Sequence, residues 1–258
     1  MERIQNLIPP IPKMDAVLSY SELLKMKVAA YNNRIGTLIG YDCQVCHNKG
    51  YIAKIIDDDE VMSECRCMKI RDTLLRIKQS GLEQQLKNCT FKNFETENEW
   101  QQNIKTAAVD FVNSNAIGFF IGGQSGCGKT HICTAIVGNM IKQGKTARYF
   151  VWRDDSVILK SLINDREYTE RINEFKTADV LYIDDLFKQD EVKDADKKLA
   201  FEIIDYRVRQ QLKTIISTEL DEAALIRCDE AIAGRIFQIS RGFRLIVSKD
   251  RKKNYRLR

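Results

Sequence analysis

One run of residues has the types and spacing that phosphate binding requires. The segment FFIGGQSGCGKTHI contains Gly-x4-Gly-Lys-Thr, formed by Gly123, Gly128, Lys129 and Thr130. Glycines let the backbone turn tightly so that N–H groups point at phosphate oxygens, and a following helix N-terminus adds positive potential. The lysine can reach the outer phosphates, and the threonine hydroxyl can hold magnesium. An apolar run before the loop and an amphipathic pattern after it argue against the alternative, a chance match in a glycine-rich turn. The expected contacts with ATP or ADP are Gly123, Ser125, Gly126, Cys127, Gly128, Lys129, Thr130 and His131.

A pair of acids is the expected partner of this loop. Asp184 and Asp185 follow the apolar run VLYI and stand where a buried strand should end. Magnesium takes oxygen ligands and keeps much of its water, so we expect Thr130 and Asp184 to hold Mg²⁺. Asp185 is expected to polarise the attacking water, where many ATPases use the longer Glu, so hydrolysis is slow or the water is held differently. With Lys129, these two acids are predicted to be catalytic. Their alternative role is to cap the next helix.

Four of the eight cysteines form a second pattern. Cys43 and Cys46 are followed, after eighteen residues, by Cys65 and Cys67. Four thiolates can surround zinc tetrahedrally, and such a closed site is structural because no ligand position stays open. The intervening residues read as two strands about an acidic turn, which would bring both pairs together. Zinc is the predicted ligand and would supply much of the folding energy of so small a module; an iron–sulfur cluster and unliganded thiols are the alternatives. His47 is a substitute ligand or a surface imidazole.

Length and composition bound the class of protein. The chain has 258 residues, 44% hydrophobic and 30% charged, which is ordinary globular composition for one large or two modest domains. It shows no secretory signal and no apolar run long enough to span a membrane, which predicts a cytoplasmic protein without membrane partners. In that reducing compartment the cysteines are not expected to form disulfides.

The order of patterns along the chain predicts two modules. Residues 1–13 hold all three prolines and are expected to form an extended arm, and residues 15–33 have the composition of a helix. After the cysteines, a second helical pattern stops at Gly81. The later part alternates short apolar runs with helical segments, as in a parallel sheet with helices on its faces. The five runs are AIGFFIG, ARYFVW, DVLYID, TIIST and FRLIVS. The predicted modules are residues 1–82 and 83–258.

The order of these motifs resembles that of the AAA+ ATPases of the DnaC/DnaI type, which load the replicative helicase in bacteria and phages. The resemblance runs through the phosphate loop, YIDDLFK, TIISTEL and AIAGRIFQIS, together with the cysteine block and TFKNF. It implies a P-loop AAA+ parallel sheet flanked by helices, preceded by a small helical module with a zinc hairpin. It also implies an ATPase with Mg²⁺ and Zn²⁺ that binds the hexameric helicase through its N-terminal module and helps to place it on single-stranded DNA.

Three further residues take roles from the same resemblance. Thr218 matches a polar sensor of the terminal phosphate, a position that is often Asn, with Glu219 as the adjacent alternative. Arg235 matches an arginine finger that offsets charge in a neighbouring subunit's site, and its alternative is an exposed helix arginine. Arg256, in NYR, matches a terminal sensor arginine. A finger acting in trans implies self-association through the ATPase domain and hydrolysis that depends on assembly.

DNA contacts have two candidate regions. Between the second and third apolar runs the chain has room for two helices, and in the resembled proteins an extra helix here touches single-stranded DNA. Lys160, Arg166, Tyr168 and Arg171 have suitable chemistry, although the acids between them fit a solvated helix pair equally well. The tail over residues 240–258 holds eight Lys or Arg and could meet nucleic acid phosphates or form a solvated edge.

Two other classes of protein remain as alternatives. An IstB-like transposition helper has a similar ATPase part, but such proteins lack, as a rule, the cysteine block. A zinc-containing P-loop nucleoside kinase places its phosphate loop before its zinc site, which is the reverse of the order in this chain.

Overall fold

The protein divides into two compact units in the computed structural model, which describes residues 19–79, 82–188 and 191–257. The units comprise Met1–Met68 and Lys69–Arg258. The prolines of the predicted arm lie outside the described residues. The boundary between the two units lies between Met68 and Lys69, before the predicted boundary near residue 82. The helix that follows the cysteines makes its ion pairs with the second unit, and this accounts for the difference.

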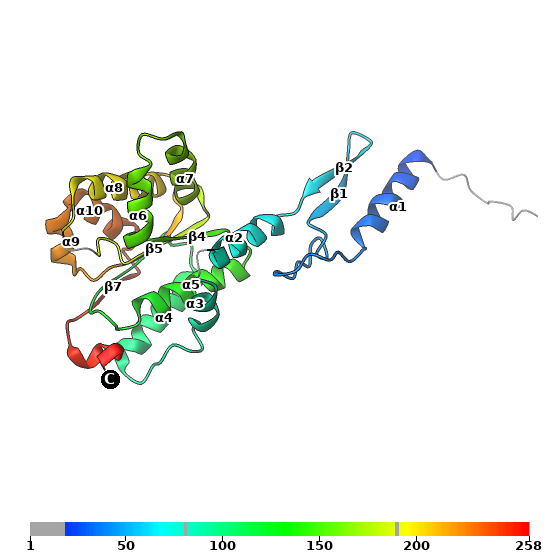
Figure 1. The fold of residues 1–258 in the computed structure, drawn as a ribbon. Helices are drawn as coiled ribbons and strands as arrows, with labels where there is room; N and C mark the ends of the chain where they lie inside the picture. The colour runs from blue at the N-terminus through cyan, green and yellow to red at the C-terminus, as the bar shows by residue number, and fades with distance from the viewer. Residues whose placement is uncertain (1–18, 80–81, 189–190, 258) are drawn as a thin grey trace, which may run out of the picture. The chain divides into compact units, whose positions relative to one another are not determined.

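The first unit contains a helix followed by a two-stranded hairpin (Figure 1). Its elements are α1 (Tyr20–Asn32), β1 (Tyr51–Ile56) and β2 (Asp59–Glu64). A capping box begins α1: the hydroxyl of Ser19 accepts from the N–H of Glu22, and the Glu22 carboxylate accepts from the N–H of Ser19. The helix expected over residues 15–33 is confirmed over the part of it that is described.

A two-residue turn joins the antiparallel strands of the hairpin. Asp57 and Asp58 both have left-handed backbones, with φ of 51° and 62°. Such a turn matches the twist of the flanking strands, and Asp tolerates this conformation. The side-chain amide of Asn32 donates to the carbonyl of Ala53 and its oxygen accepts from the Ala53 N–H, which ties α1 to β1. The hairpin with an acidic turn is thus confirmed.

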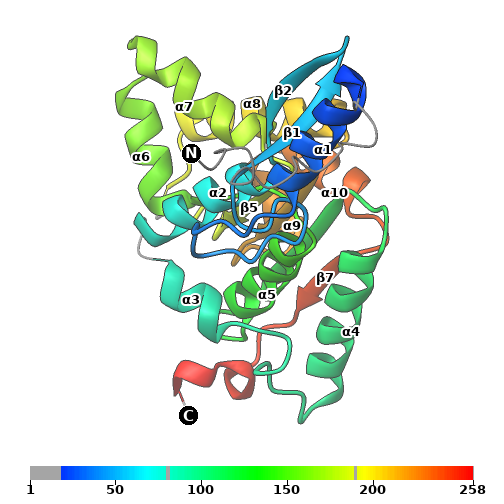
Figure 2. The same cartoon turned by 90° about the vertical axis from the view of Figure 1, so that its right-hand side faces the viewer.

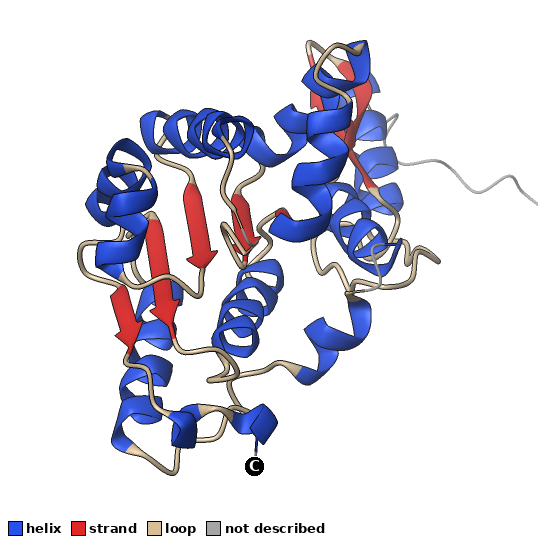
Figure 3. Cartoon of the chain, turned by 60° about the vertical axis from the view of Figure 1, so that its left-hand side comes forward, coloured by secondary structure: helices blue, strands red, loops and turns tan. Residues whose placement is uncertain are grey.

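The second unit is a parallel five-stranded sheet flanked by helices. Its strands are β3 (Gly118–Gly123), β4 (Ala147–Val151), β5 (Val180–Asp184), β6 (Lys213–Ser217) and β7 (Arg244–Val247). They lie in the order β4-β5-β6-β3-β7, and each neighbouring pair is parallel. Figure 3 shows the strands running side by side. Each strand falls within one of the five apolar runs or overlaps it, so the predicted fold class is confirmed.

Helices cover the sheet, and those that follow β3 connect its strands (Figures 1 and 2). They are α2 (Cys67–Gln79), α3 (Glu83–Asn88), α4 (Glu99–Asn113), α5 (Lys129–Lys142), α6 (Trp152–Ser161), α7 (Arg166–Thr177), α8 (Asp194–Arg209), α9 (Glu222–Cys228) and α10 (Glu230–Ile239), with the short turns η2 (Arg251–Lys253) and η3 (Tyr255–Leu257). One group is α5 with α3 and α4; in the other, α8 contacts α6, α7 and α10. The two helices expected between the second and third apolar runs are α6 and α7. None of the helices in the described ranges is long and apolar enough to cross a membrane.

The register of the strands brings three chain segments to one edge of the sheet. Ile121 of β3 pairs with Ser217 of β6, and Ile183 of β5 pairs with Ile216. Because the strands are parallel, their carboxyl ends meet there. The loop after β3 therefore lies next to Asp184.

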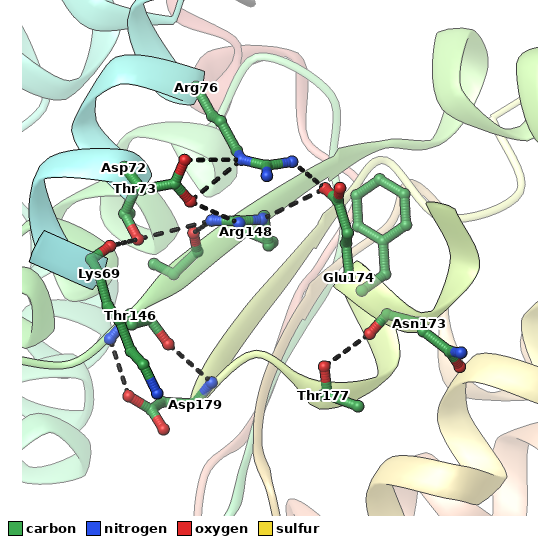
Figure 4. A network of polar contacts seen from close by, with 12 residues as sticks. Lys69, Asp72, Thr73, Arg76, Thr146, Arg148, Asn173, Glu174, Thr177 and Asp179 are labelled. Atoms are coloured by element: carbon green, nitrogen blue, oxygen red, sulfur yellow. Dashed lines mark hydrogen bonds and ion pairs between the residues drawn. The ribbon is translucent and has the colours of Figure 1, made fainter. Parts of the chain in front are cut away.

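Charged side chains anchor α2 on the edge strand β4 (Figure 4). Arg148 of β4 lies 3.1 Å from a carboxylate oxygen of Asp72 on α2 and 3.7 Å from one of Glu174 on α7. Arg76, on α2, pairs with the same two carboxylates. An isolated exposed ion pair contributes little, but two guanidinium groups that share two carboxylates form a network. This network explains why α2 from Lys69 onward belongs with the second unit.

Candidate nucleotide-binding site

Three glycines give the loop after β3 its shape. Gly123, Gly126 and Gly128 have φ values of 99°, 70° and 94°, in the left-handed region that other residues avoid. A Cβ at Gly123 would lie 2.1 Å from the carbonyl oxygen of Val247, and one at Gly126 would lie 1.9 Å from Oδ1 of Asn254. The left-handed conformation therefore favours glycine at all three positions, and at Gly123 the contact with a backbone oxygen also excludes a side chain.

The helix α5 begins directly after this loop. Its N-cap, Gly128, has no side chain to satisfy the first N–H groups of the helix. Such N–H groups, with the positive end of the helix dipole, favour a phosphate. The ammonium of Lys129 is buried and donates to the carbonyls of Gly123 at 3.0 Å and Gln124 at 2.7 Å. Both acceptors are neutral, so the lysine charge is available to an anion at the loop.

Three hydroxyl groups converge on one oxygen of Asp184. Its Oδ1 accepts from Thr130 at 3.1 Å, from Ser217 at 2.7 Å and from Tyr182 at 2.5 Å. Burial raises the pKa of Tyr182 well above its ordinary value, so this phenol stays protonated and donates. The carboxylate is thus held beside the first turn of α5. Thr130 and Asp184 present oxygen ligands side by side, and this donor set fits a magnesium ion.

A strained turn follows β5. Asp185 and Phe187 have left-handed backbones, with φ of 55° and 61°, which for non-glycine residues costs about 1–3 kcal/mol each. The end of β6 holds the turn in place: the Ser217 hydroxyl accepts from the N–H of Asp185, and the Ser217 carbonyl accepts from the N–H of Leu186. Thr218 adds a hydrogen bond from its hydroxyl to the carbonyl of Leu186. These contacts fix the direction in which Asp185 leaves the sheet.

The loop, the turn and the C-terminal segment enclose a cavity of about 240 Å³. Its lining residues are Ser125, Gly126, Gly128, Lys129, Thr130, His131, Asp185, Lys188, Glu219, Tyr255 and Arg256. Most of the residues expected to contact nucleotide therefore lie together. Arg256 comes from the far end of the chain and is held there because the N–H of Tyr255 donates to the carbonyl of Gly126 at 3.0 Å.

The segment TFKNF lies beside the same loop. The ring of Phe94 meets the imidazole of His131 edge to face, with 5.3 Å between centroids, and His131 also contacts the carbonyl of Thr90 at 2.9 Å. Phe94 and Cys127 line a second cavity of about 200 Å³, which shares Gly126, Gly128 and His131 with the first. A larger cavity, of about 500 Å³, is lined by side chains of both charges from α2, β4, α6 and α7 and by none of the predicted nucleotide residues.

Among the predicted residues of the ATPase site, those that do not line the nucleotide cavity are Gly123, Cys127, Asp184, Thr218 and Arg235. Thr218 is fully buried and its hydroxyl is used by the carbonyl of Leu186, so the sensor expected at Thr218 is not positioned to meet a phosphate. Glu219 lines the cavity instead, because successive side chains of an extended segment point to opposite sides. Arg235 pairs with Asp205 on α8 at 2.8 Å. Its role in a neighbouring subunit stays a prediction.

Two cavity residues carry no signal in the sequence. Lys188 follows the acidic pair, where it resembles any exposed lysine, and only the strained turn brings it back over Asp185. Tyr255 lies in the basic tail, and only the fold shows that its backbone contacts the phosphate loop. The motif YIDDLFK contains Lys188, but the motif does not show where the Lys188 side chain lies.

The four predicted metal ligands form one cluster in the first unit. Cys43, Cys46, Cys65 and Cys67 are all buried, and their sulfur atoms lie within 4.8 Å of one another. The Sγ atoms of Cys43 and Cys65 are 3.7 Å apart, and those of Cys46 and Cys67 are 3.4 Å apart. Tetrahedral zinc with Zn–S bonds of about 2.3 Å places its sulfurs about 3.8 Å apart. The cluster therefore fits a zinc ion.

Hydrogen bonds prepare one of these thiols for a metal. The N–H of Gly50 donates to the sulfur of Cys46 at 3.3 Å. Burial opposes ionisation of Cys46, but this N–H and the neighbouring thiols outweigh it and lower its pKa to about 7. Burial raises the pKa of Cys65, and a divalent cation would favour the thiolate form of both. His47 is exposed and is not part of the cluster.

Comparisons with known proteins agree with this architecture. The sequence model of the family described as IstB-like ATP binding protein matches residues 44–236. The phage-like element PBSX protein XkdC of Bacillus subtilis (strain 168) is 29% identical over 225 residues, which cover 80% of this chain and 82% of XkdC. The replicative helicase loader DnaC of Escherichia coli (strain K12) is 30% identical over 149 residues, covering 56% of this chain and 59% of DnaC. The crystal structure of DnaI has the same fold, with a TM-score of 0.54 and 19% identity over 64% of this chain and 92% of that chain.

The family match covers well over half of the chain and spans the phosphate loop, the acidic pair and most of the cysteine cluster. The parallel order of the sheet and the position of the loop at its carboxyl edge agree with that match. This chain belongs to the IstB-like ATP-binding proteins, the IstB/DnaC-like family of AAA+ ATPases.

Proposed function

We propose that this protein is an ATP-controlled loader that binds the hexameric replicative helicase in the cytoplasm and helps to place it on single-stranded DNA. The proposal depends chiefly on one observation: a phosphate loop with its acids occupies one unit, and a cysteine-held unit with exposed apolar side chains precedes it. The relatives named as DnaC helicase loaders, which match 66% and 56% of this chain, support this function.

Several residues in and beside the nucleotide cavity have a task within this proposal. The loop N–H groups and Lys129 bind the phosphates of ATP or ADP. Thr130 and Asp184 hold Mg²⁺, which when bound offsets phosphate charge. Asp185 orients the attacking water and accepts its proton, and its side chain is one methylene shorter than Glu, so turnover by one subunit is slow. Arg256 is a cation on the wall of the cavity that can contact the phosphates.

Arg235 would complete the site of a neighbouring subunit. In this chain its guanidinium pairs with Asp205 and lies 4.3 Å from the ring centroid of Phe201, outside the nucleotide cavity of its own subunit. A guanidinium brought to a second subunit's cavity would offset charge on the transferred phosphoryl group. Self-association through the ATPase unit, and hydrolysis that depends on it, follow from this role.

The cysteine-held unit offers a surface that fits a protein partner. On α1, Leu24 is buried against the rest of the unit, while Tyr20, Leu23 and Met26 are 68%, 52% and 59% exposed. These three residues recur every third position and therefore share one face of the helix. An exposed apolar stripe of this kind marks an interaction site. A zinc ion held by four cysteines would stabilise the unit and leave its surface to the helicase.

The DNA-contacting residues proposed on α6 and α7 differ in their availability. Lys160 pairs with the buried carboxylate of Asp196, and the hydroxyl of Tyr168 donates to Glu202 at 2.7 Å. Arg166 and Arg171 are exposed. We therefore propose the two arginines, before the lysine and the tyrosine, as the residues that meet the DNA backbone.

Co-purification with the replicative helicase tests the proposal. The full chain should retain the purified hexameric helicase on a column, and the variant Leu23→Ser/Met26→Ser should lose most of that retention. Leu75→Ser, which changes an exposed leucine on α2, is the matched control and should bind as the wild type does. A full chain that retains no replicative helicase contradicts the loader function.

The transposition helper ATPase is the second candidate, because the matching family carries the IstB name. A chain that ignores every helicase but binds duplex DNA and stimulates a transposase would support it. Phosphorylation of a nucleoside by the purified chain would instead support the kinase alternative. The cysteine cluster ahead of the ATPase unit favours the loader over both.

A further inference from the structure

A lysine and two carboxylates form a cluster inside the nucleotide cavity. The Nζ of Lys188 lies 2.7 Å from Oδ2 of Asp185 and 2.9 Å from Oε1 of Glu219. The same oxygen of Glu219 accepts from the hydroxyl of Ser125, in the phosphate loop, at 2.8 Å. All four residues line the cavity. The cluster therefore links the phosphate loop, the end of β6 and the turn after β5.

The charges of this cluster are interdependent. Burial raises the pKa of Glu219, but the hydrogen bonds from Lys188 and Ser125 outweigh burial, so its pKa lies below the ordinary value. Burial lowers the pKa of Lys188, and its bonds to Asp185 and Glu219 outweigh that effect and raise it. One cation is thus shared by two carboxyl groups. A carboxylate facing a phosphate is unfavourable by itself, and Lys188 is the group that offsets it.

The backbone around Lys188 is fixed while its side chain has room to move. The N–H of Lys188 donates to the carbonyl of Asp185 at 2.9 Å, which closes the turn that the end of β6 holds in place. Phe187, immediately before it, is buried. The Lys188 side chain is 32% exposed and ends in three rotatable donors on a four-carbon stem. Its ammonium can therefore change partner within the cavity without any movement of the turn.

We propose that Lys188 is a positioning residue that distinguishes ATP from ADP: its ammonium, shared here by Asp185 and Glu219, turns to the terminal phosphate of ATP and leaves Asp185 free to orient the attacking water. The inference rests on the nucleotide binding proposed above. In this role Lys188 is a phosphate-responsive group on the turn after β5. Thr218, the sensor expected from the sequence, is buried at the end of β6 and donates to the carbonyl of Leu186.

Nucleotide affinity tests this role without reference to turnover. The dissociation constants of ADP and of a non-hydrolysable ATP analogue, both with Mg²⁺, are measured by calorimetry for the wild type and for Lys188→Met. We expect the variant to bind the ATP analogue at least about tenfold more weakly, since a charge-assisted contact is lost, and to bind ADP more weakly by a clearly smaller factor, since Lys188 also offsets the charges of Asp185 and Glu219. Lys188→Arg should restore most of the preference for the ATP analogue.

Two controls separate this role from other effects of the substitution. Lys198→Met, on the exposed side of α8, removes the same charge at a distance from the cavity and should change neither affinity. Thermal unfolding of Lys188→Met should match that of the wild type, because the side chain is not part of the core. A general electrostatic effect would lower the affinity for both nucleotides in both Lys188→Met and Lys198→Met.

The outcomes distinguish this inference from the proposed function. Suppose that the wild type binds both nucleotides and that Lys188→Met lowers the affinity for both equally, or for neither. The sensing role of Lys188 is then wrong, while the nucleotide site stands. If the wild type binds neither nucleotide, the proposed function itself fails. A lost preference for the ATP analogue that Lys188→Arg recovers supports the inference.

Discussion

The hydroxyl of Thr130 donates to Oδ1 of Asp184 across 3.1 Å and so joins the first turn of α5 to the end of β5. This contact brings the two predicted magnesium ligands together from positions more than fifty residues apart in the chain. Because Ser217 and Tyr182 bind the same oxygen, the carboxylate keeps its direction. The site is thus held ready by hydroxyl groups on three neighbouring elements.

Lys129→Ala should abolish nucleotide binding. The ammonium is buried at the loop, and no other side chain of the loop carries a positive charge to offset phosphates. We expect affinity for ADP and for an ATP analogue to fall at least about a hundredfold, as measured by calorimetry. Lys142→Ala, at the exposed far end of α5, is the matched control. Unchanged affinity in Lys129→Ala would remove the phosphate-loop assignment.

Asp185→Asn should separate binding from hydrolysis. The amide keeps the size of the side chain but cannot accept a proton from water, so turnover should fall about a hundredfold or more. Affinity for ADP should stay within a few-fold of the wild type. Asp184→Asn should instead weaken the dependence of nucleotide affinity on Mg²⁺ concentration. If Asp184→Asn and Asp185→Asn changed turnover and the Mg²⁺ dependence of affinity to the same extent, the two acids would not have separate roles in metal binding and hydrolysis.

Metal analysis should return one zinc per chain, and Cys65→Ser should lower it. The four sulfurs lie at distances that suit tetrahedral zinc, and removing one thiolate leaves an incomplete site. Chelation should expose backbone amides of β1 and β2 to hydrogen exchange and spare those of the ATPase unit. Cys228→Ser, at a lone half-buried cysteine, should keep its zinc. An iron chromophore in the purified protein would overturn the choice of metal.

Mixing two inactive variants tests whether Arg235 acts in trans. Arg235→Ala keeps an intact phosphate loop, and Lys129→Ala keeps an intact finger, so neither alone should hydrolyse ATP in the assembled state. In a mixed assembly some sites would combine Lys129 from one subunit with Arg235 from the next, and hydrolysis should reappear. If mixtures stay inactive while the wild type is active, Arg235 serves its own subunit through Asp205.

The stability of the ATPase unit should respond to pH through Asp155. Burial raises the pKa of this carboxyl to about 6, above its unfolded value, although it accepts a hydrogen bond from the N–H of Val151 at 2.7 Å. The folded state therefore binds the proton more tightly than the unfolded state, and ionisation costs stability as pH rises from about 4 to above 6. We expect Asp155→Asn to be more stable than the wild type by about 1–2 kcal/mol at pH 7.5 and by much less at pH 4.5.

Urea unfolding of both proteins at the two pH values measures this difference. Asp154→Asn, at the adjacent exposed carboxyl, should show no such dependence on pH. A gain for Asp155→Asn that is the same at pH 4.5 and 7.5 would mean that ionisation of Asp155 is not its cause.

Much of this architecture could be predicted from local patterns in the sequence. The phosphate loop, the acidic pair and the four cysteines were recognisable because their chemistry depends on spacing within short segments. The strands could be predicted because a parallel sheet buried on both faces needs uninterrupted apolar runs. Gly123 also belongs to such a local pattern, since its left-handed backbone and the nearby backbone oxygen of Val247 leave no room for a side chain.

Other features depended on contacts between distant segments, which spacing does not record. The register of β6 and the hydrogen bonds at its end decided that Thr218 is buried and Glu219 faces the nucleotide cavity. The strained turn after β5 places the Lys188 ammonium against the carboxyl groups of Asp185 and Glu219. From the sequence, then, came the chemistry of the phosphate loop and of the cysteine cluster, because each is a short-range pattern. Only the tertiary structure decided which charges share the nucleotide cavity, because that follows from how three strand ends and the C-terminal segment pack against one loop.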